Sequence, residues 1–350
     1  MVDTANAEPN PEAELPPLEE RPLVTFAVFA YNQEKYIREA VEGAFSQTYE
    51  PLEIILSDDC STDRTFEIMQ EMAAAYDGPH EVRVRRNDIN LGTAAHFSTV
   101  AALINGDALV AAAGDDISKP ERSKVLFRQW MNSERRQGIY HSNMLRFADG
   151  QDLASAAPVR PRKILSQKEA QSRIYNGGPY YLLAPTFMYT RDFLNQFPPL
   201  LGGSIVEDGP MIYRCALIAE FIHVDEFLVY ARSTGENSGS GLTIRRPGHW
   251  NRLFRSRMLT AFNMLSDANH LEIKGAPCDK RIAAAMTKRI RHLSNFIIPE
   301  SDHVRWGDRL RLAFHFALGR AYASNLKTNL ILGAEVLLGG RSLRRLIGRR

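Results

Sequence analysis

The sequence predicts an α/β fold in which a mostly parallel central sheet is flanked by helices and followed by a helical C-terminal extension. Between residues 23 and 116, four apolar runs typical of strands alternate with segments whose apolar residues recur at helical spacing. This alternation indicates parallel pairing, because each helix carries the chain back to the end of the sheet where the strand began. From about Trp250 onward the apolar residues recur at helical spacing only, which predicts the extension.

The first two strands and their helices occupy residues 23–76. The runs LVTFAVFAYN (23–32) and LEIILSDD (52–59) predict strands that are buried on both faces. Helical spacing follows each run, first at Tyr36, Ile37, Ala40, Val41, Ala44 and Phe45, and then at Phe66, Met69, Ala73 and Tyr76. We expect Thr62 or Asp63 to cap the second helix, because their side-chain oxygens can accept bonds from its first amides.

Two further strands and a helix complete the alternation. EVRVRRN (81–87) alternates as a strand, AAHFSTVAALI (94–104) predicts a helix, and ALVAAAGDD (108–116) predicts a fourth strand. A helix start is then expected at SKPE, because Ser118 and Glu121 have the spacing of a capping box and Pro120 suits a first turn.

The rest of the chain is less regular. SQKEAQSRIY (166–175) again has capping-box spacing, and FIHVDEFLVYAR (221–232) predicts a strand pair or one long strand. We divide the chain into a disordered lead-in rich in Pro and Glu at residues 1–21, an α/β domain at 22–240 with halves 22–127 and 128–240, and a helical extension at 241–350.

Composition excludes several classes of protein. A net charge of +2 is too small for a dedicated nucleic-acid binder, so no nucleic-acid partner is expected. Cys60, Cys215 and Cys278 lie too far apart for a zinc site or a disulfide framework, which favours a reducing, cytoplasmic compartment. The N-terminus lacks the basic and apolar regions of a signal peptide, and no uncharged run reaches the roughly 18 to 20 residues of a membrane span.

Polar side chains follow three of the predicted strands at the point where each strand ends. These are Asn32 after the first strand, Asp58 and Asp59 after the second, and Asp115 and Asp116 after the fourth. Helix capping would use one carboxylate, but two adjacent carboxylates repel each other unless a cation or ligand donors lie beside them. Because neither GxGxxG nor GxxxxGK[ST] occurs, a nucleotide at this edge would be held by carboxylates and a metal ion.

Three stretches, in this order, resemble the nucleotide-sugar-binding half of the family-2 glycosyltransferases. They are VTFAVFAYNQEKYIREAVEGAFSQTYEPLEIILSDDCSTDRTFEIM (24–69), NDINLGTAAHFSTV (87–100) and GDDISKPER (114–122). The resemblance implies an inverting enzyme with a GT-A-like fold. It further implies that residues 22–127 bind the nucleotide-sugar and residues 128–240 bind the acceptor.

The resemblance also assigns nucleotide-binding residues. Asp59, with Asp58 beside it, matches the acid that hydrogen-bonds the base, and Ala30, Tyr31 and Asn32 line the same pocket. Asn90 and Gly92 of NLG match a turn beside the nucleotide.

Metal binding is implied at the end of the fourth strand. Asp115 matches the second acid of the family's D-x-D motif, which holds Mg or Mn together with the ribose and diphosphate of the donor. Ala113 occupies the position of the first acid, so fewer protein ligands are available, and Asp116 is the candidate to compensate.

A catalytic base is implied in GGSIVEDGPMIYR. This segment resembles the family's E-D motif, in which the Asp removes the proton of the acceptor hydroxyl, so Asp208 is the expected base and Glu207 the second candidate. On its own, a Glu-Asp pair is equally typical of the first turn of a helix. Arg232 of YARSTGENSGSG is expected to stabilise the leaving diphosphate, although Thr234 stands where family members often carry His.

The expected reaction moves a sugar from a nucleotide-sugar, taken to be a UDP-sugar, to a hydroxyl of a glycan or glycolipid in bacterial surface polysaccharide synthesis. Tyr180 and Tyr181 are acceptor-binding candidates on a loop. The basic C-terminal helices fit peripheral contact with the inner face of the cell membrane, a partner helix, or an ordinary solvated face. The alternatives are an idle nucleotide-sugar-binding or assembly protein, which Ala113 favours, and a nucleotidyltransferase, which the missing glycine-rich loop disfavours.

Overall fold

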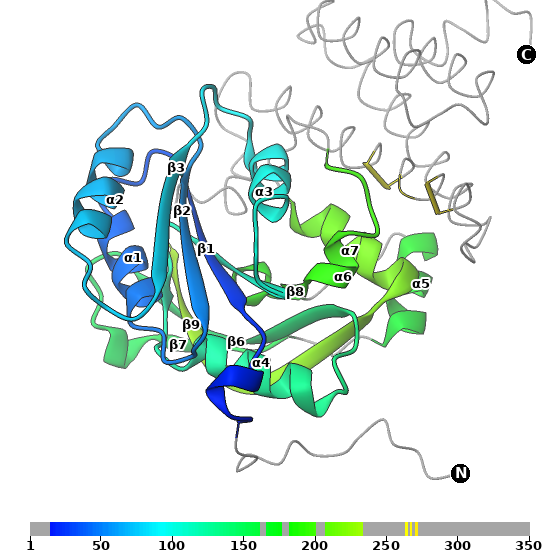
Figure 1. Ribbon diagram of the computed structural model, residues 1–350. Helices are drawn as coiled ribbons and strands as arrows, with labels where there is room; N and C mark the ends of the chain where they lie inside the picture. Colours follow the sequence, from blue (N-terminus) through cyan, green and yellow to red (C-terminus); the bar gives the residue numbers. More distant parts are fainter. Residues whose placement is uncertain are drawn as a thin grey trace, which may run out of the picture.

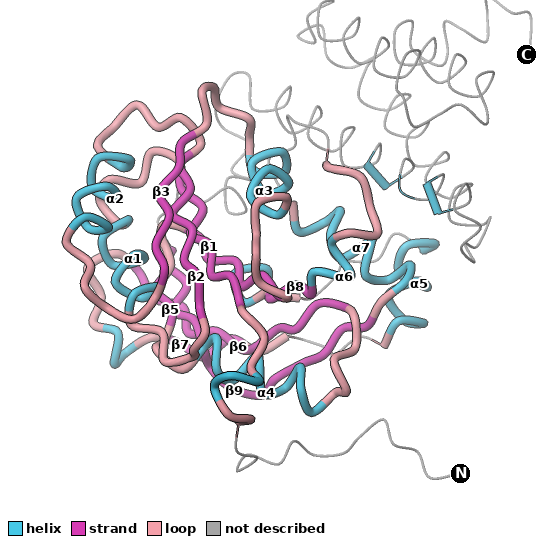
Figure 2. The backbone as a smooth tube through the Cα atoms, in the orientation of Figure 1, coloured by secondary structure: helices cyan, strands magenta, loops and turns pink. Residues whose placement is uncertain are grey.

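The computed structural model describes residues 15–161, 166–176, 182–200 and 207–233, together with Asn263, Met264, Asp267, His270 and Leu271. Within these residues the strands form one sheet of order β3-β2-β1-β4-β8-β6-β9-β5, and β7 pairs with β6 (Figures 1 and 2). The strands are β1 (Val24–Ala30), β2 (Leu52–Asp58), β3 (Glu81–Arg86), β4 (Ala108–Ala113), β5 (Ile117–Ser118), β6 (Gly138–Ala148), β7 (Ala157–Val159), β8 (Met188–Thr190) and β9 (Glu220–Ser233).

Helices cover both faces of this sheet. They are α1 (Ile37–Phe45), α2 (Thr65–Ala74), α3 (Thr93–Ala101), α4 (Arg122–Asn132), α5 (Gln167–Asn176), α6 (Arg191–Leu194) and α7 (Asp208–Ile218), with single 3-10 turns at Leu18–Glu20, Leu153–Ser155 and Ala184–Thr186. One apolar core joins the sheet to α1, α2 and α4, and a second joins its other face to α3, α6 and α7. Figure 1 shows α1 and α2 on one side of β1–β3 and α3 on the other.

The parallel strands end level with one another at one edge. In the paired strands Ala30 of β1 lies opposite Asp58 of β2, and Phe29 lies opposite Ala113 of β4. Loops that leave these strands therefore meet at the carboxyl edge, where ligands bind in open α/β sheets.

The sheet is parallel in its long pairings. In the described part of the chain, β1–β2, β1–β4, β2–β3 and β6–β9 are parallel. The antiparallel pairings of β5, β7 and β8 are two or three residues long. Figure 2 shows β6 and β9 running alongside each other, so the predicted segment 221–232 is one long strand.

One predicted capping box forms and the other does not. Ser166 Oγ accepts a bond from the Glu169 amide at 3.3 Å, and Glu169 accepts from the Ser166 amide at 3.2 Å, as expected. The box predicted at Ser118 and Glu121 is wrong. Ser118 belongs to β5, which pairs with β9, and its Oγ accepts a bond from Arg122 Nη1 at 2.9 Å, so α4 begins only at Arg122.

The cap of α2 differs in detail from the prediction. The residue before the helix is Arg64, but Asp63 Oδ1 accepts a bond from the Thr65 amide at 3.0 Å. The Thr62 amide instead donates to Asn32 Oδ1 at 2.8 Å, so Thr62 ties the β2 loop to the β1 loop.

Part of the predicted extension packs against the α/β core. Met264 and Leu271 are buried in the same cluster as α7, and the Asp267 carboxylate pairs with Arg214 of α7. No helix among the described residues combines the length and apolar character that crossing a membrane requires. The rest of 241–350, residues 1–14, Tyr180, Tyr181 and Thr234 lie outside the described residues.

Candidate functional site

Asp58, the last residue of β2, and Asp59, which follows it, stabilise the loops at this end of the strand. Asp58 is fully buried, and its Oδ2 accepts a bond from the Ser61 amide at 2.9 Å and lies 3.2 Å from Arg86 Nε. These contacts fix the turn that follows β2. Asp58 therefore supports the site from within the protein.

Asp59 holds the loop between β3 and α3. It is 2% exposed, and its oxygens accept bonds from Asn87 Nδ2 at 2.7 Å and from the amides of Leu91 and Gly92, both at 2.9 Å. Gly92 has a φ of 77°, a left-handed backbone that glycine adopts without strain. Asn90, predicted to lie beside the nucleotide, is exposed on this loop.

The end of β1 completes this part of the edge. The Ala30 carbonyl accepts a bond from the Asp59 amide at 2.9 Å. Tyr31 is 45% exposed, and Asn32 has a φ of 52° and donates its amide to Ser61 Oγ at 2.9 Å. Hydrogen bonds thus connect the ends of the first two strands into one group of residues.

The acids after β4 face different surroundings. Asp116 Oδ1 accepts a bond from the backbone amide of Arg232 at 2.8 Å, and burial together with the charge of Asp115 raises the pKa of Asp116 to about 7. Asp115 is only partly buried, whereas Gly114 and Asp116 on either side of it are buried. Burial still raises the pKa of Asp115, although the charge of Arg232 and a hydrogen bond from the Gln33 side chain act to lower it. Asp116 is thus committed to β9, whereas Asp115 is the more accessible carboxylate.

Arg232 is held on all sides. Its Nη1 lies 3.0 Å from Asp149 Oδ1, its Nη2 lies 2.6 Å from Glu39 Oε2, and its guanidinium sits over the rings of Tyr36 and Phe147. Its Nε donates to the Asp115 carbonyl at 3.1 Å. In this arrangement Arg232 orients the β4 turn, and its predicted contact with a leaving diphosphate stays a prediction.

Glu207 and Asp208 open α7. Asp208 is the first helical residue, and its Oδ1 accepts a bond from the Gly209 amide at 2.7 Å. Burial, and then the charge of Asp208, raise the pKa of Glu207 to about 7, and burial raises the pKa of Asp208 as well. Raised pKa values bring a carboxylate closer to the range that suits a general base at neutral pH.

The acid pair of α7 lies near the middle of the sheet. Burial, and then the charges of Glu207 and Asp208, raise the pKa of Tyr189 in β8, and β8 is the direct neighbour of β4. The α7 acids therefore lie near β8, beside the strand that precedes Asp115 and Asp116.

The residues fit a divalent cation only in part. Among the described residues, no three His, Cys, Asp or Glu side chains are grouped so that they could hold a metal ion. Ala113 contributes no ligand, and Asp116 is bonded to β9. A cation at Asp115 would therefore take its other ligands from diphosphate oxygens and water, as Mg²⁺ commonly does.

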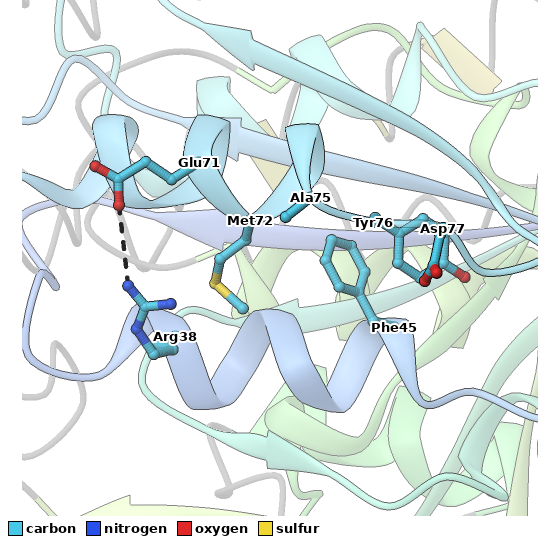
Figure 3. A pocket seen from close by; sticks show the side chains of 7 residues that line it. All are labelled: Arg38, Phe45, Glu71, Met72, Ala75, Tyr76 and Asp77. Atoms are coloured by element: carbon cyan, nitrogen blue, oxygen red, sulfur yellow. Dashed lines mark ion pairs between the residues drawn. The ribbon is translucent and has the colours of Figure 1, made fainter.

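A separate cavity lies away from this edge. It has a volume of about 310 Å³ and lies between α1 and α2, lined by Arg38, Phe45, Glu71, Met72, Ala75, Tyr76 and Asp77 (Figure 3). Arg38 and Glu71 face each other across it at 4.0 Å. None of the predicted site residues lines this cavity.

Comparison with known proteins decides the family. Residues 25–196 match the family described as Glycosyl transferase family 2. This part of the chain belongs to the family. The match begins in β1 and extends past β8, so it contains the carboxyl edge with Asp59 and Asp115 but not the α7 acids.

Relatives and solved structures are similar over different lengths. An uncharacterised protein of Mycobacterium tuberculosis is 30% identical over 197 residues, which cover 53% of this chain and 56% of that protein. Glycosyltransferase GlyG of Streptococcus pneumoniae is 26% identical over 224 residues, 61% of this chain and 72% of that protein. This family-2 chain thus spans about half the length of the first of these relatives.

The fold is shared with a solved structure. S. aureus TarS 1-349 in complex with UDP-GlcNAc superposes with a TM-score of 0.53 at 18% identity, over 89% of this chain and 90% of that one. The expected GT-A-like architecture of this family-2 protein is confirmed.

Several contacts at the edge were not predicted from the sequence. Arg85 and Asn87 stand behind Asp59, and Glu39 and Asp149 hold Arg232. One signal could have indicated Asn87, because it follows the third strand as Asn32 follows the first. Asp149 had no such signal, since its contact spans 83 residues of chain.

Proposed function

We propose that the protein transfers a sugar from a nucleotide-sugar, specifically a UDP-sugar, to a hydroxyl of a glycan or glycolipid, with inversion at the anomeric carbon. Membership in glycosyl transferase family 2 supports the reaction class. The TarS structure that shares the fold was solved with UDP-GlcNAc, which supports a uridine donor.

The donor would bind at the carboxyl edge. Asp59 would accept a hydrogen bond from an N–H of the base, and the surface formed by Tyr31, Asn32 and the 90–92 turn would line the nucleoside. Asp115 would face the ribose and diphosphate. Mg or Mn bound at Asp115 would neutralise the charge that develops on the leaving diphosphate.

The transfer itself would use the acids of α7. Asp208 would accept the proton of the acceptor hydroxyl while the hydroxyl oxygen bonds to the anomeric carbon. The bond from that carbon to the diphosphate oxygen breaks on the opposite face, and the leaving nucleoside diphosphate keeps the electron pair. The charge of Asp208 raises the pKa of Glu207, and by the same repulsion a charged Glu207 would oppose the ionisation of Asp208.

The setting of the reaction is part of the proposal. A role in bacterial surface polysaccharide synthesis is supported by similarity to Escherichia coli chondroitin synthase, which is 30% identical over 122 residues, 35% of this chain and 17% of that protein. We place the protein in the cytoplasm, with an acceptor presented at the inner face of the membrane.

The observation that carries the proposal is the half-buried acid pair at the start of α7, near the strand that neighbours β4. Asp208→Asn should lower the transfer rate by about 10² to 10⁴, the usual contribution of a general base, while leaving UDP affinity unchanged. The assay measures release of UDP from UDP-sugars with glycan acceptors. Asp192→Asn, which changes an exposed acid in the first turn of α6, is the matched control and should keep its rate.

A different outcome would favour the idle protein that Ala113 suggests. If wild type, Asp208→Asn and Asp192→Asn all bind UDP equally and none releases UDP from any donor, the edge binds nucleotide without catalysis. Equal transfer rates in all three would instead exclude Asp208 as the base.

A further inference from the structure

A chain of polar side chains lies behind Asp59, on the face of the sheet that α3 covers. We call it the β3 network: Ser57 of β2, Arg85 of β3, Asn87 and Asp59 after these strands, and His96 of α3. All but Arg85 are buried, and none of the five has been given a role beyond Asp59 itself.

Arg85 stands at the branch point of this network. Its Nη1 donates to Ser57 Oγ at 2.5 Å, and its Nη2 donates to Asn87 Oδ1. Asn87 Nδ2 then donates to Asp59 Oδ1 at 2.7 Å, and the Asn87 amide donates to the Asp58 carbonyl at 2.9 Å. The orientation of the Asp59 carboxylate thus depends on Arg85 through a single amide side chain.

The other arm of the network fixes the position of Arg85. Ser57 Oγ and His96 Nε2 lie 2.6 Å apart, and burial lowers the pKa of His96 to about 4. Both tautomers of a neutral imidazole make this contact: Nε2 accepts from the Ser57 hydroxyl, or Nε2–H donates to the Ser57 oxygen, which has a second lone pair for Arg85. His96 also contacts Phe29 of β1 edge to face, with ring centroids 5.3 Å apart.

Asp59 in turn fixes the loop that the nucleotide would meet. Its oxygens hold the amides of Leu91 and Gly92, so a rotation of the carboxylate would release both. A carboxylate offers about four lone-pair sites, and three are filled by these bonds and by Asn87. One site on a correctly oriented Asp59 is left for a donor on the ligand.

We propose that Arg85 is a positioning residue for nucleotide binding: through Asn87 it fixes the Asp59 carboxylate and the 88–92 loop in the geometry that receives the base. This inference rests on the proposed function. A guanidinium suits this role, because its two terminal nitrogen atoms bond Ser57 and Asn87 at the same time. The single ammonium nitrogen of a lysine does not reach both partners in this way.

The same strand supplies a matched control. Arg83 lies two residues before Arg85 on the same face of β3, and its Nη2 pairs with Glu53 of β2 at 2.7 Å. Both arginines therefore bridge β3 to β2, but Arg83 does so at the opposite end of the strand from Asp59. A purely structural role would make the two substitutions equivalent.

The experiment compares Arg85→Gln, Arg85→Lys and Arg83→Gln with wild type. Calorimetric titrations measure affinity for UDP and for inorganic diphosphate, each with Mn²⁺, and hydrogen exchange is followed at the amides of Leu91 and Gly92. Both Arg85 variants should lose about tenfold in UDP affinity, the effect of one charge-assisted bond, with diphosphate affinity unchanged and exchange at the two amides faster. Arg83→Gln should match wild type in all three.

The outcomes separate this inference from the proposed function. If Arg85→Gln and Arg83→Gln show the same affinities and the same exchange, the positioning role is wrong even though UDP binds. An Arg85→Lys variant that binds UDP as tightly as wild type would also overturn it, because a positive charge alone would then suffice. If wild type binds no UDP, the proposed function fails and this inference fails with it as a statement about nucleotide binding.

Discussion

At the scale of single residues, the two carboxylates that follow β4, Asp115 and Asp116, have different roles. Asp116 is 6% exposed and bonded to the Arg232 amide, so its charge acts inside the protein. The backbone carbonyl of Asp115 accepts a hydrogen bond from Arg232 Nε, which positions this residue. Asp115 itself is more exposed than Asp116. Of these two adjacent acids, Asp116 therefore holds the fold, and Asp115 is the one that we propose to meet the ligand.

This division predicts a pH-dependent stability for Asp116→Asn. Wild-type Asp116 has a pKa of about 7 in the folded state and about 3.9 in an unfolded chain, so the folded state binds more protons between these values. The contribution of Asp116 to the free energy of unfolding therefore falls as pH rises from about 4 to 7. An asparagine at this position does not titrate, so its contribution stays constant. The melting temperature of the variant relative to wild type should rise over that window, and a falling difference would contradict the assignment.

The α7 acids predict a pH–rate profile. A base must be deprotonated, and burial raises the pKa of Asp208 above its ordinary value, so kcat/KM should keep rising with pH beyond the range in which an exposed aspartate ionises. Glu207→Gln removes a neighbouring negative charge, which eases ionisation of Asp208 and should move the rising limb to lower pH. Rates measured across the neutral range test this, and an unmoved limb would show that Glu207 does not influence the base.

At the scale of elements, Arg232 joins three parts of the chain that are distant in sequence. Its guanidinium connects β9 to α1 through Glu39 and to the turn after β6 through Asp149. The side chain is 4% exposed, whereas its partners are about half exposed, so water screens part of the attraction.

Arg232→Lys should therefore destabilise the protein, because an ammonium cannot hold both carboxylates and the Asp115 carbonyl together. We expect a loss of about 1 to 3 kcal/mol in the free energy of unfolding, below the full cost of breaking a buried pair. Arg136→Gln is the control, since its bond to Glu220 at 3.1 Å is exposed on both sides and should be worth about 0 to 1 kcal/mol. If both variants lose the same free energy of unfolding in denaturant titrations, Arg232 does not hold these three parts of the chain together.

At the scale of the whole molecule, one buried ion pair links the α/β core to the segment that contains residues 263–271. Arg214 Nε and Nη2 each lie 2.8 Å from an Asp267 oxygen, and both side chains are 5% exposed or less. Met264 and Leu271 are buried in the same core. The α/β domain therefore does not close its core without residues that follow β9.

Asp267→Ala should accordingly cost about 3 to 5 kcal/mol, because it leaves the Arg214 charge buried and unpaired. Arg214→Met combined with Asp267→Leu should recover much of that loss, since no charge then remains buried. Denaturant unfolding of the three proteins measures this. A double variant as unstable as Asp267→Ala would mean that packing, not the charge, determines the loss.

The sequence was informative wherever short-range pattern decides structure. The strands β1, β2 and β4 could be predicted because burial on both faces makes them continuous apolar runs. The box at Ser166 forms because its two residues are neighbours at the start of one helix. The box at Ser118 failed because pairing of β5 with β9 joins residues more than 100 positions apart. For the same reason the sequence showed the acids of the edge but not that Arg232 or Arg85 holds them.

The central claim is that the carboxyl edge binds a nucleotide-sugar donor with a divalent cation at Asp115. The most direct test is a calorimetric titration of UDP into wild type and Asp115→Asn, each with and without Mn²⁺. We predict that Mn²⁺ strengthens UDP binding to wild type by at least about tenfold, and that this gain disappears in Asp115→Asn while metal-free binding is retained. Absence of UDP binding to wild type, or an equal Mn²⁺ gain in the variant, would contradict the account.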